Sequence, residues 1–539
     1  MKRVPTDQGA SATHPLATGS AEPGRSGPAA TGSAEPGRGG QASAAAPASA
    51  APASASPAAA PAAAPAATPA AAPAATTPAS AASESLRERV RRLDRPGPRY
   101  TSYPTAVEFT EAFGEAEYRE ALARAAATPD APLALYTHLP FCVERCLYCA
   151  CNVVITPHLA VADAYLTRLY REIDAVAPLL GERRDVAQFH LGGGTPTYYD
   201  PDTLATLMAH FRTQFRLLPG AEVALEVDPR VTTVEHIERL AELGFNRLSL
   251  GVQDFDADVQ HAIGRVQSVE QTAGLMEAGR RLGFTSTNLD LIYGLPYQTP
   301  RSLARTLAQV LELRPDRLAI YSFAFLPKAF AHQRALAEEA IPRGEDKLAL
   351  LELTRDTLLA AGYVDVGMDH FALPSDDLVL AQRDGRLWRN FMGYTTARAP
   401  DMVGFGVSAI GEVGGAYVQN EKKLNRYEEV VDAGRLPVAR GFRLDDDDRL
   451  RQHLIREWMC HFRVDKRAVE ARFGVPFDRY FERELRALEP LQREGLVRLG
   501  EDVLEAGELG RLLPRNVAMV FDRYLQAKAG APSPFSRTV

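Results

Sequence analysis

Short apolar segments alternate with longer amphipathic ones six times between residues 133 and 323, and this alternation restricts the chain to few folds. The short segments are rich in aliphatic and β-branched residues, which is typical of buried strands; they are 133–136, 186–191, 222–227, 247–252, 287–292 and 318–323. The intervening segments have helical periodicity, as in 162–180, where Tyr165, Leu169, Ile173 and Val176 share one face. The pattern predicts an α/β fold with a parallel sheet and outer helices, either open or partly or fully closed into a barrel.

Ligands bind such folds at the C-terminal ends of the strands, and the notable motifs of this sequence fall there. The cysteine-rich stretch 142–151 follows the first predicted strand, and Gly192–Gly194 follow the second. Asp228, Gln253 and the stretch 294–296 follow the third, fourth and fifth. We therefore expect all of them on one face of the sheet.

The cysteines are concentrated, since four of the five lie between positions 142 and 151. A secreted disulfide framework would spread them, so the cluster indicates metal ligation in a reducing compartment. Cys142, Cys146 and Cys149 can wrap a loop around one corner of a 4Fe–4S cube and leave its fourth iron open for a substrate, as a catalytic zinc keeps one open position. Structural zinc would favour two separate CxxC pairs or added histidines, and a bacterial ferredoxin would show CxxCxxCxxxCP; the sequence has neither pattern.

The remaining composition separates an N-terminal arm from a globular body. Residues 1–85 are rich in Ala, Pro, Gly and Ser and are expected to be a disordered arm that is dispensable for activity; a transit peptide is disfavoured by its few arginines and many prolines. The net charge of −7 argues against nucleic-acid binding, and no apolar run indicates a membrane span or a secretory signal, so a cytoplasmic location is expected. We expect a leading segment at 86–130 that covers the substrate, an α/β core at 131–375, and a mostly helical C-terminal domain at 376–539 that covers the active site.

Two motifs resemble the radical S-adenosylmethionine (SAM) superfamily. Cys142-x3-Cys146-x-Tyr148-Cys149 is similar to its cluster motif, and the run from Gly192 to Pro196 is similar to its glycine element, which contacts the amino group of SAM. The resemblance implies that SAM chelates the open iron, and that an electron from the cluster cleaves the sulfonium bond to give methionine and a 5′-deoxyadenosyl radical. The protein would tune the cluster and exclude water and oxygen.

From about residue 95 to the C-terminus, the chain resembles the oxygen-independent coproporphyrinogen III oxidase family. The strings that carry this resemblance include 97–104, 136–152, 189–198, 226–230, 251–255, 290–296, 367–372 and 390–396. It implies a partial, TIM-like (β/α)6 barrel with a mainly helical C-terminal domain. The implied reaction converts two propionates of coproporphyrinogen III to vinyl groups with loss of carbon dioxide, giving protoporphyrinogen IX for haem synthesis without oxygen.

The resemblance also assigns residues. Cys142, Cys146 and Cys149 would bind the 4Fe–4S cluster, and a first SAM would be held by Tyr136, Gly193 and Glu226. A second SAM would lie near Tyr148, Gly194, Thr195, Gln253, Arg265, Asp290, Ala324 and Ile410. Tyr136, Cys151 and Glu226 are the expected catalytic residues, with Cys151 lining the site rather than binding iron. Judged from the residues alone, Asp228 and Asp290 either bind ribose hydroxyls or pair with an arginine such as Arg230.

Partners and rival functions follow from the same comparison. The four substrate carboxylates need cationic or hydrogen-bonding groups, for which Arg99, Tyr100, Tyr103 and Arg265 are candidates. An electron donor such as flavodoxin or ferredoxin is implied, and a monomer is expected. The rivals are a haem-chaperone relative without decarboxylase activity and a cluster or haem carrier. The chaperones have Cys-Asp-Phe at the end of the cluster motif and lack the segment 97–104, so both that segment and Cys151 favour the oxidase.

Overall fold

The computed structural model describes residues 86–528 and 535–538. The predicted disordered arm, 1–85, lies outside these residues. The six predicted strands form adjacent parallel strands of one sheet: β1 (Leu133–Leu139), β4 (Asp185–Gly193), β5 (Arg216–Val227), β6 (Arg247–Gln253), β7 (Ser286–Tyr293) and β8 (Arg317–Ser322). The α/β class with a parallel core is therefore confirmed.

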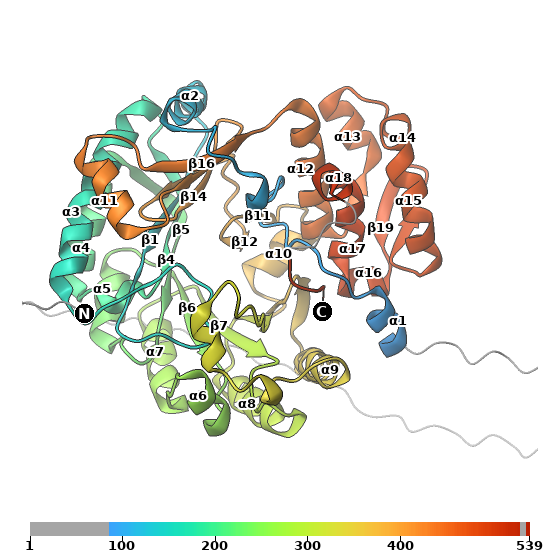
Figure 1. The fold of residues 1–539 in the computed structure, drawn as a ribbon, viewed down its shortest axis with the longest axis horizontal. Helices are drawn as coiled ribbons and strands as arrows, with labels where there is room; N and C mark the ends of the chain where they lie inside the picture. Colours follow the sequence, from blue (N-terminus) through green and yellow to red (C-terminus); the bar gives the residue numbers. More distant parts are fainter. Residues whose placement is uncertain (1–85, 529–534, 539) are drawn as a thin grey trace, which may run out of the picture. The chain divides into compact units, whose positions relative to one another are not determined.

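The predicted helices lie between these strands. They are α3 (Leu159–Val176), α4 (Pro201–Gln214), α5 (Val234–Glu242), α7 (Val269–Arg281) and α8 (Pro300–Leu313), with the short α6 (Ala257–Ile263) added after β6 and α9 (Glu345–Ala360) after β8. The apolar face predicted for α3 is fully buried at Tyr165, Leu169, Ile173 and Val176. These helices pack around the sheet in Figure 1. The ends of the strands are therefore the part of the sheet where a ligand site can form.

The sheet has further strands on both sides, and within the described residues it contains twelve in all. On the β8 side lie the antiparallel β10 (His370–Ala372) and β9 (Val364–Gly367). On the β1 side lie β13 (Asp401–Phe405), β14 (Ile410–Val413), β15 (Ala416–Asn420) and β16 (Val438–Arg443), of which β13 is parallel to β1. The first and last strands of this order, β16 and β9, are not paired with each other in the described sheet. The sheet therefore does not close completely, as expected for a partial barrel.

The start of the C-terminal region differs from the sequence prediction. Residues 401–443, expected within a mostly helical domain from 376 onward, belong to the main sheet, and α11 (Leu424–Asp432) lies between β15 and β16. Their strands are short, and they join the sheet through β13, which pairs with β1 about 270 residues earlier in the chain, so local periodicity does not reveal them. Before them, α10 (Asp377–Arg383) and the hairpin β11 (Trp388–Asn390) with β12 (Gly393–Thr395) stand outside this sheet.

A mostly helical domain begins at α12 (Asp446–His461) and has its own apolar core around Trp458, Phe477 and Phe481. Its other helices are α13 (Lys466–Phe473), α14 (Phe477–Tyr480), α15 (Glu482–Arg493), α16 (Glu508–Leu512), α17 (Pro514–Ala518) and α18 (Arg523–Ala527). A small sheet of β17 (Arg463–Asp465), β19 (Val503–Ala506) and β18 (Val497–Leu499) completes it. No helix in the described part of the chain is both long and apolar enough to span a bilayer.

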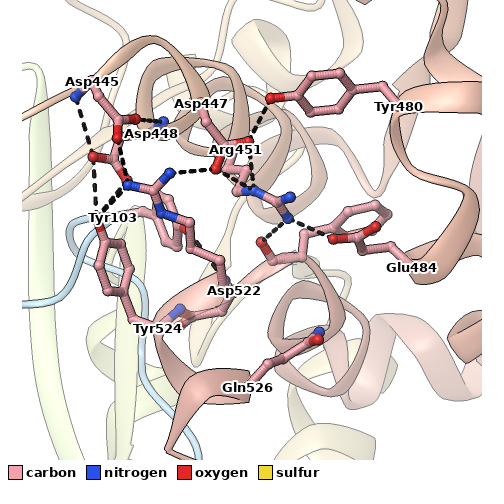
Figure 2. Close-up of polar contacts among 12 residues, drawn as sticks. Tyr103, Asp445, Asp447, Asp448, Arg451, Tyr480, Glu484, Asp522, Tyr524 and Gln526 are labelled. Carbon is pink, nitrogen blue, oxygen red and sulfur yellow. Dashed lines mark hydrogen bonds and ion pairs between the residues drawn. The ribbon is translucent and has the colours of Figure 1, made fainter.

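The leading segment is divided between the two cores. Its helix α2 (Glu115–Ala126) packs Tyr118 and Leu122 into the core of the sheet, whereas α1 (Leu86–Leu93) and Tyr103 belong to the C-terminal core. Figure 2 shows Tyr103 beside the polar network that ties α18 to the first turn of α12. There the Arg523 guanidinium donates to Asp445 across 2.7 Å and to Asp447 across 2.6 Å.

Candidate functional site

The three cysteines of the CxxxCxxC motif line one cavity of about 350 Å³ at the C-terminal ends of β4–β7, which we call the cysteine cavity. The loop that carries them begins at β2 (Phe141–Cys142), which pairs with β3 (Val154–Ile155). Its middle is fixed where the Leu147 N–H donates to the Ile263 carbonyl across 2.9 Å. Thr195 Oγ1 lies 3.6 Å from the Cys142 Sγ. The loop therefore faces the glycine-rich end of β4, as the sequence predicts.

The thiols have different acidities. A hydrogen bond from Cys151 is the main reason why the pKa of Cys149 is lowered to about 7, and the Cys151 N–H also donates to its sulfur across 3.4 Å. Burial raises the pKa of Cys142 to about 11. Cys149 therefore ionises more readily than Cys142 to the thiolate, the form that binds metal. Cys151 lines this cavity and supports Cys149 from outside the ligand trio.

Two arginines lie beside the thiol of Cys146, the middle cysteine of the motif. Arg230 Nη2 lies 3.4 Å and Arg265 Nη1 lies 3.5 Å from its sulfur. Both guanidinium groups also bond to the Asp228 carboxylate, at 2.8 Å and 2.9 Å. Asp228 is thus an arginine partner, which is one of the two roles that the sequence left open. Arg265 keeps its predicted place in the cavity, whereas the sequence analysis did not foresee Arg230 at the sulfur.

The glycines at the end of β4 and directly after it leave room only for backbone beside the cysteine loop. A Cβ on Gly194 would lie 2.6 Å from the carbonyl oxygen of Phe141, and one on Gly193 would lie 2.7 Å from the His138 ring. Gly193 also has φ +117°, a conformation that glycine adopts without strain. The absence of side chains at these positions brings the backbone N–H and C=O groups of β4 to the cavity wall, where they can contact a ligand.

The donor set fits an iron–sulfur cube better than a single ion. In the described part of the chain, no three His, Cys, Asp or Glu side chains converge on a point where one metal ion would bind. A cube binds each cysteine through a different iron, so its thiolates stand further apart than the ligands of one ion. Three thiols around one cavity, with a backbone cradle opposite them, match that requirement.

A second cavity of about 610 Å³ adjoins the first and shares Cys151, Gly193 and Glu226 with it; we call it the His138 cavity. His138 Nε2 must donate to the Asn152 carbonyl, 2.9 Å away, so its Nδ1 accepts from the Tyr136 hydroxyl across 2.9 Å. Burial lowers the pKa of His138, which keeps the ring neutral.

Glu226 forms part of the wall between the two cavities. Its Oε2 accepts from the Gly193 N–H across 3.2 Å, and its side chain remains 47% exposed. The carboxylate therefore has free lone pairs for ligand hydroxyls. Tyr136, Gly193 and Glu226, the residues predicted for a first SAM, all line the His138 cavity.

Most residues predicted for the second SAM line the cysteine cavity: Tyr148, Gly194, Thr195, Gln253, Arg265 and Asp290. Two differ. Ile410 lines the His138 cavity, so the structure places it with the first set. Ala324 lines a separate cavity of about 570 Å³ with Phe323 and Lys347, because the chain turns away from the barrel after β8.

A third, smaller cavity of about 140 Å³ lies inside the barrel and shares Glu226 with the other two; we call it the barrel cavity. Asp290 forms part of its wall and accepts from Asn288 Nδ2 across 2.8 Å. Burial, and then the nearby charge of Glu226, raises the pKa of Asp290 to about 7. Asp290 has no arginine partner among the described residues, unlike Asp228.

The four candidates for the substrate carboxylates already have partners within the protein. The Tyr100 hydroxyl donates to Asp522, the Tyr103 hydroxyl accepts from the Arg523 N–H, Arg99 pairs with Asp369, and Arg265 pairs with Asp228. Residues that the sequence analysis did not select include His138, His190, Phe391, Met392, Gln419 and Lys422 in the wall of the His138 cavity. The last four come from the start of the predicted C-terminal domain, where only the string 390–396 gave a signal.

Comparison with known proteins agrees with this geometry. Residues 136–310 match the radical SAM superfamily, and residues 444–513 match the HemN C-terminal domain. The chain is 46% identical to an oxygen-independent coproporphyrinogen III oxidase of Salmonella typhimurium over 84% of its own length and 97% of that protein. It is 47% identical to one of Pseudomonas aeruginosa over 81% and 95% of the two chains. The structure of the Escherichia coli coproporphyrinogen III oxidase HemN, described as a radical SAM enzyme, matches with a TM-score of 0.76 at 45% identity, over 79% of this chain and 97% of that one.

Proposed function

The chain belongs to the oxygen-independent coproporphyrinogen III oxidase family, and from that premise we propose how its residues divide the work of the reaction. The enzyme oxidises coproporphyrinogen III without molecular oxygen, as a radical SAM enzyme of haem biosynthesis. Two propionates lose carbon dioxide and become vinyl groups. It uses a 4Fe–4S cluster and two molecules of SAM.

Cys142, Cys146 and Cys149 hold the cluster in this proposal, and the observation that carries it is their convergence on one cavity opposite the glycine cradle. When bound, the cluster supplies the electron for the reductive cleavage of SAM. Arg230 and Arg265 balance thiolate charge at Cys146, and Cys151 donates to Cys149. The protein thereby sets the electrostatics of the cluster.

The two cavities divide the SAM-binding residues. Tyr136, Gly193, Glu226 and Ile410 serve the molecule in the His138 cavity, where Glu226 has free acceptors for ribose hydroxyls. Tyr148, Gly194, Thr195, Gln253, Arg265 and Asp290 serve the molecule in the cysteine cavity. The His138–Tyr136 hydrogen bond holds the phenol of Tyr136 in place against the first molecule.

The finer partner assignments have this support. A one-electron donor such as flavodoxin or ferredoxin reaches the cluster over the outer side of the cysteine loop, where Val143 is 47% exposed and Arg145 is also exposed. The protein works as a monomer in the cytoplasm, where the ligating cysteines stay reduced. Light scattering of the reconstituted protein tests the monomer.

The deciding experiment is an anaerobic assay of the reconstituted protein with coproporphyrinogen III, SAM and a reductant. Protoporphyrinogen IX and 5′-deoxyadenosine are expected together, and Cys146→Ser is expected to give neither. The buried Cys460, 1% exposed in the C-terminal core, provides the matched control, so Cys460→Ser keeps both products. Cluster binding without either product would support a carrier role instead.

A further inference from the structure

Arg389, in the hairpin outside the main sheet, is a buried arginine whose charge no carboxylate of residues 86–528 and 535–538 balances. It lies in β11, is 5% exposed, and stacks on the Tyr394 ring with 4.8 Å between the guanidinium carbon and the ring centre. Its Nη2 donates to the Arg99 carbonyl across 3.3 Å. Its Nε and Nη1 are buried and have no hydrogen-bond partner in the part of the chain that the structure describes. No described carboxylate forms an ion pair with it.

Each of the other buried arginines of the described chain has a carboxylate partner or two backbone acceptors, although the Nε of Arg265 also has no hydrogen-bond partner. Arg183, Arg265 and Arg451 each pair with a carboxylate, and Arg515 donates to two backbone carbonyls. A guanidinium stays protonated at any physiological pH, so Arg389 cannot avoid the cost of its burial by losing its proton. An unpaired buried charge is strongly unfavourable, whereas an anionic ligand with two oxygens would satisfy both free nitrogens.

The position of Arg389 relates this charge to the site. Its stacking partner Tyr394 lines the barrel cavity, as do His370, Tyr321 and Met392. The His370 ring packs edge-on against Tyr394 at 5.2 Å and against Tyr321 at 6.2 Å. The barrel cavity shares Glu226 with the cysteine and His138 cavities. Arg389 therefore lies behind the aromatic wall of the barrel cavity, which shares Glu226 with the other two cavities.

The electrostatics around Arg389 are positive. The pKa of His370 is lowered to about 4, first by burial and then by the Arg389 charge, so the ring is neutral and acts only as a hydrogen-bonding group. Arg99, whose guanidinium lies over Tyr321 at 5.5 Å, is neutralised by Asp369. Arg389 is therefore a cation beside this wall whose charge no described carboxylate balances.

We propose that Arg389 binds a propionate carboxylate of the tetrapyrrole substrate, with its free Nε and Nη1 as the donors. This assignment rests on the proposed function, because the anion is identified as the carboxylate of that substrate. Arg389 is a substrate-positioning residue in this role: it fixes one acidic side chain of the ring and thereby orients another toward the reacting centre. Arg99, Tyr100, Tyr103 and Arg265, whose polar groups already have protein partners, support the wall and the leading segment.

Binding of coproporphyrin III, the coloured oxidised form of the substrate, tests the proposal without turnover. An absorbance titration of the full-length protein should show that Arg389→Met weakens binding about tenfold to a hundredfold, the loss expected for hydrogen bonds to a charged group. Arg389→Lys should lose less, because it keeps the charge but not the paired donors. The tetramethyl ester, which has no carboxylates, should bind the wild type and Arg389→Met equally. In turnover, KM for coproporphyrinogen III should rise with little change in kcat.

Arg398→Met is the matched control. Arg398 is exposed and stacks on Trp388 of the same hairpin at 4.8 Å, so its loss removes one positive charge near the hairpin without touching the cavity wall. It should leave the affinity for coproporphyrin III unchanged. Thermal unfolding separates binding from folding, because removing an unpaired buried charge should leave the melting temperature of ligand-free Arg389→Met unchanged or raised.

The outcomes are distinct. If the wild type oxidises coproporphyrinogen III while Arg389→Met binds coproporphyrin III as the wild type does, the assignment of Arg389 is overturned and the proposed function stands. A large drop in the melting temperature of Arg389→Met, with equal affinity losses for the acid and the ester, would also overturn it by revealing a structural role. If the wild type neither binds coproporphyrin III nor oxidises its reduced form, both proposals fall together.

Discussion

The Tyr100 hydroxyl donates a hydrogen bond of 2.9 Å to the Asp522 carboxylate, which joins the leading segment to the C-terminal domain 422 residues later. Asp522 is 3% exposed and also accepts from the Tyr524 and Leu525 N–H groups at the start of α18. Tyr100 itself is 5% exposed. One buried carboxylate therefore caps a helix and anchors the segment that precedes the barrel.

Tyr100→Phe should lower the free energy of unfolding by about 1–2 kcal/mol, because it removes a donor from a buried carboxylate. Urea unfolding monitored by circular dichroism measures this. Tyr480→Phe is the matched control: its hydroxyl also donates to a carboxylate, Asp447, but the residue is 39% exposed and water can replace the bond, so the loss should stay below about 0.5 kcal/mol. Equal losses in the two variants would contradict this reading.

Glu172 should make the free energy of unfolding depend on pH in the opposite direction from a carboxyl group whose pKa is lowered by folding. It is 2% exposed, and burial raises its pKa to about 7, although Gly406, Asn420 and Tyr427 all donate to it. Between pH 4.5, near its unfolded pKa, and pH 7, the native state binds more protons than the unfolded state. The stabilising contribution of Glu172 to the free energy of unfolding is therefore fully present below about pH 4.5 and is lost as pH rises to 7.

The test is the difference in free energy of unfolding between the wild type and Glu172→Gln. Because Gln does not titrate, this difference should fall by roughly 2–3 kcal/mol from pH 4.5 to 7 and then level off. Using the difference cancels the contribution of other acids. A difference that stayed flat, or that rose across this window, would refute the raised pKa.

The parallel core was predictable because its signals are local. Runs of β-branched residues and the apolar face of α3 depend only on neighbours in the chain, and the structure places them as expected. The strand β5 begins at Arg216, earlier than predicted. The prediction missed this first part because 216–220 contains Pro219 and Gly220, which are unusual in strands, and pairs with β4 only at Arg216 and Leu217. The strands β13–β16 were missed because they join the sheet through the pairing of β13 with β1, which is a tertiary contact.

The site divides in the same way. The spacing of Cys142, Cys146 and Cys149 is a local signal, and the cavity they share follows from the ends of parallel strands. Arg230 reaches the Cys146 sulfur, and Arg389 reaches the Tyr394 ring of the barrel-cavity wall, through folding alone, because no pattern in the sequence predicts either contact. Their roles depend on whether a carboxylate of the protein becomes their partner, as Asp228 does for Arg230 and no described carboxylate does for Arg389, and only the folded chain decides that.

Gly194→Ala should abolish cluster binding while leaving the protein folded. The added Cβ would lie 2.6 Å from the Phe141 oxygen and the Pro140 carbon, both backbone atoms that cannot turn aside, so the cysteine loop must move. Iron content after reconstitution is the measurement. Gly274→Ala in α7 has nothing within 4 Å of its Cβ, so it should keep the iron and gain about 0.5–1 kcal/mol of stability. Full iron content in Gly194→Ala would show that the loop tolerates the displacement.

Arg230 should set the reduction potential of the cluster, because its guanidinium lies 3.4 Å from the Cys146 sulfur and is itself held by Asp228. Reduction adds negative charge, which a nearby cation stabilises, so Arg230→Met should make the midpoint potential more negative. The partner groups of metal ligands typically contribute ten- to a hundredfold in activity, and a loss of about that size is expected here. Potentiometric titration of the reconstituted protein gives the midpoint, and Arg230→Lys, which retains the charge, should recover most of the shift.

Arg281→Met controls for net charge in that experiment, since Arg281 is 61% exposed on α7 and pairs only weakly with Glu238 at 3.6 Å. Its midpoint potential and activity should match those of the wild type. Iron content separates tuning from binding: Arg230→Met should keep its iron, because the three thiolates remain. If its potential stayed at the wild-type value while activity fell, Arg230 would act on the shape of the cysteine loop and not on the charge of the cluster.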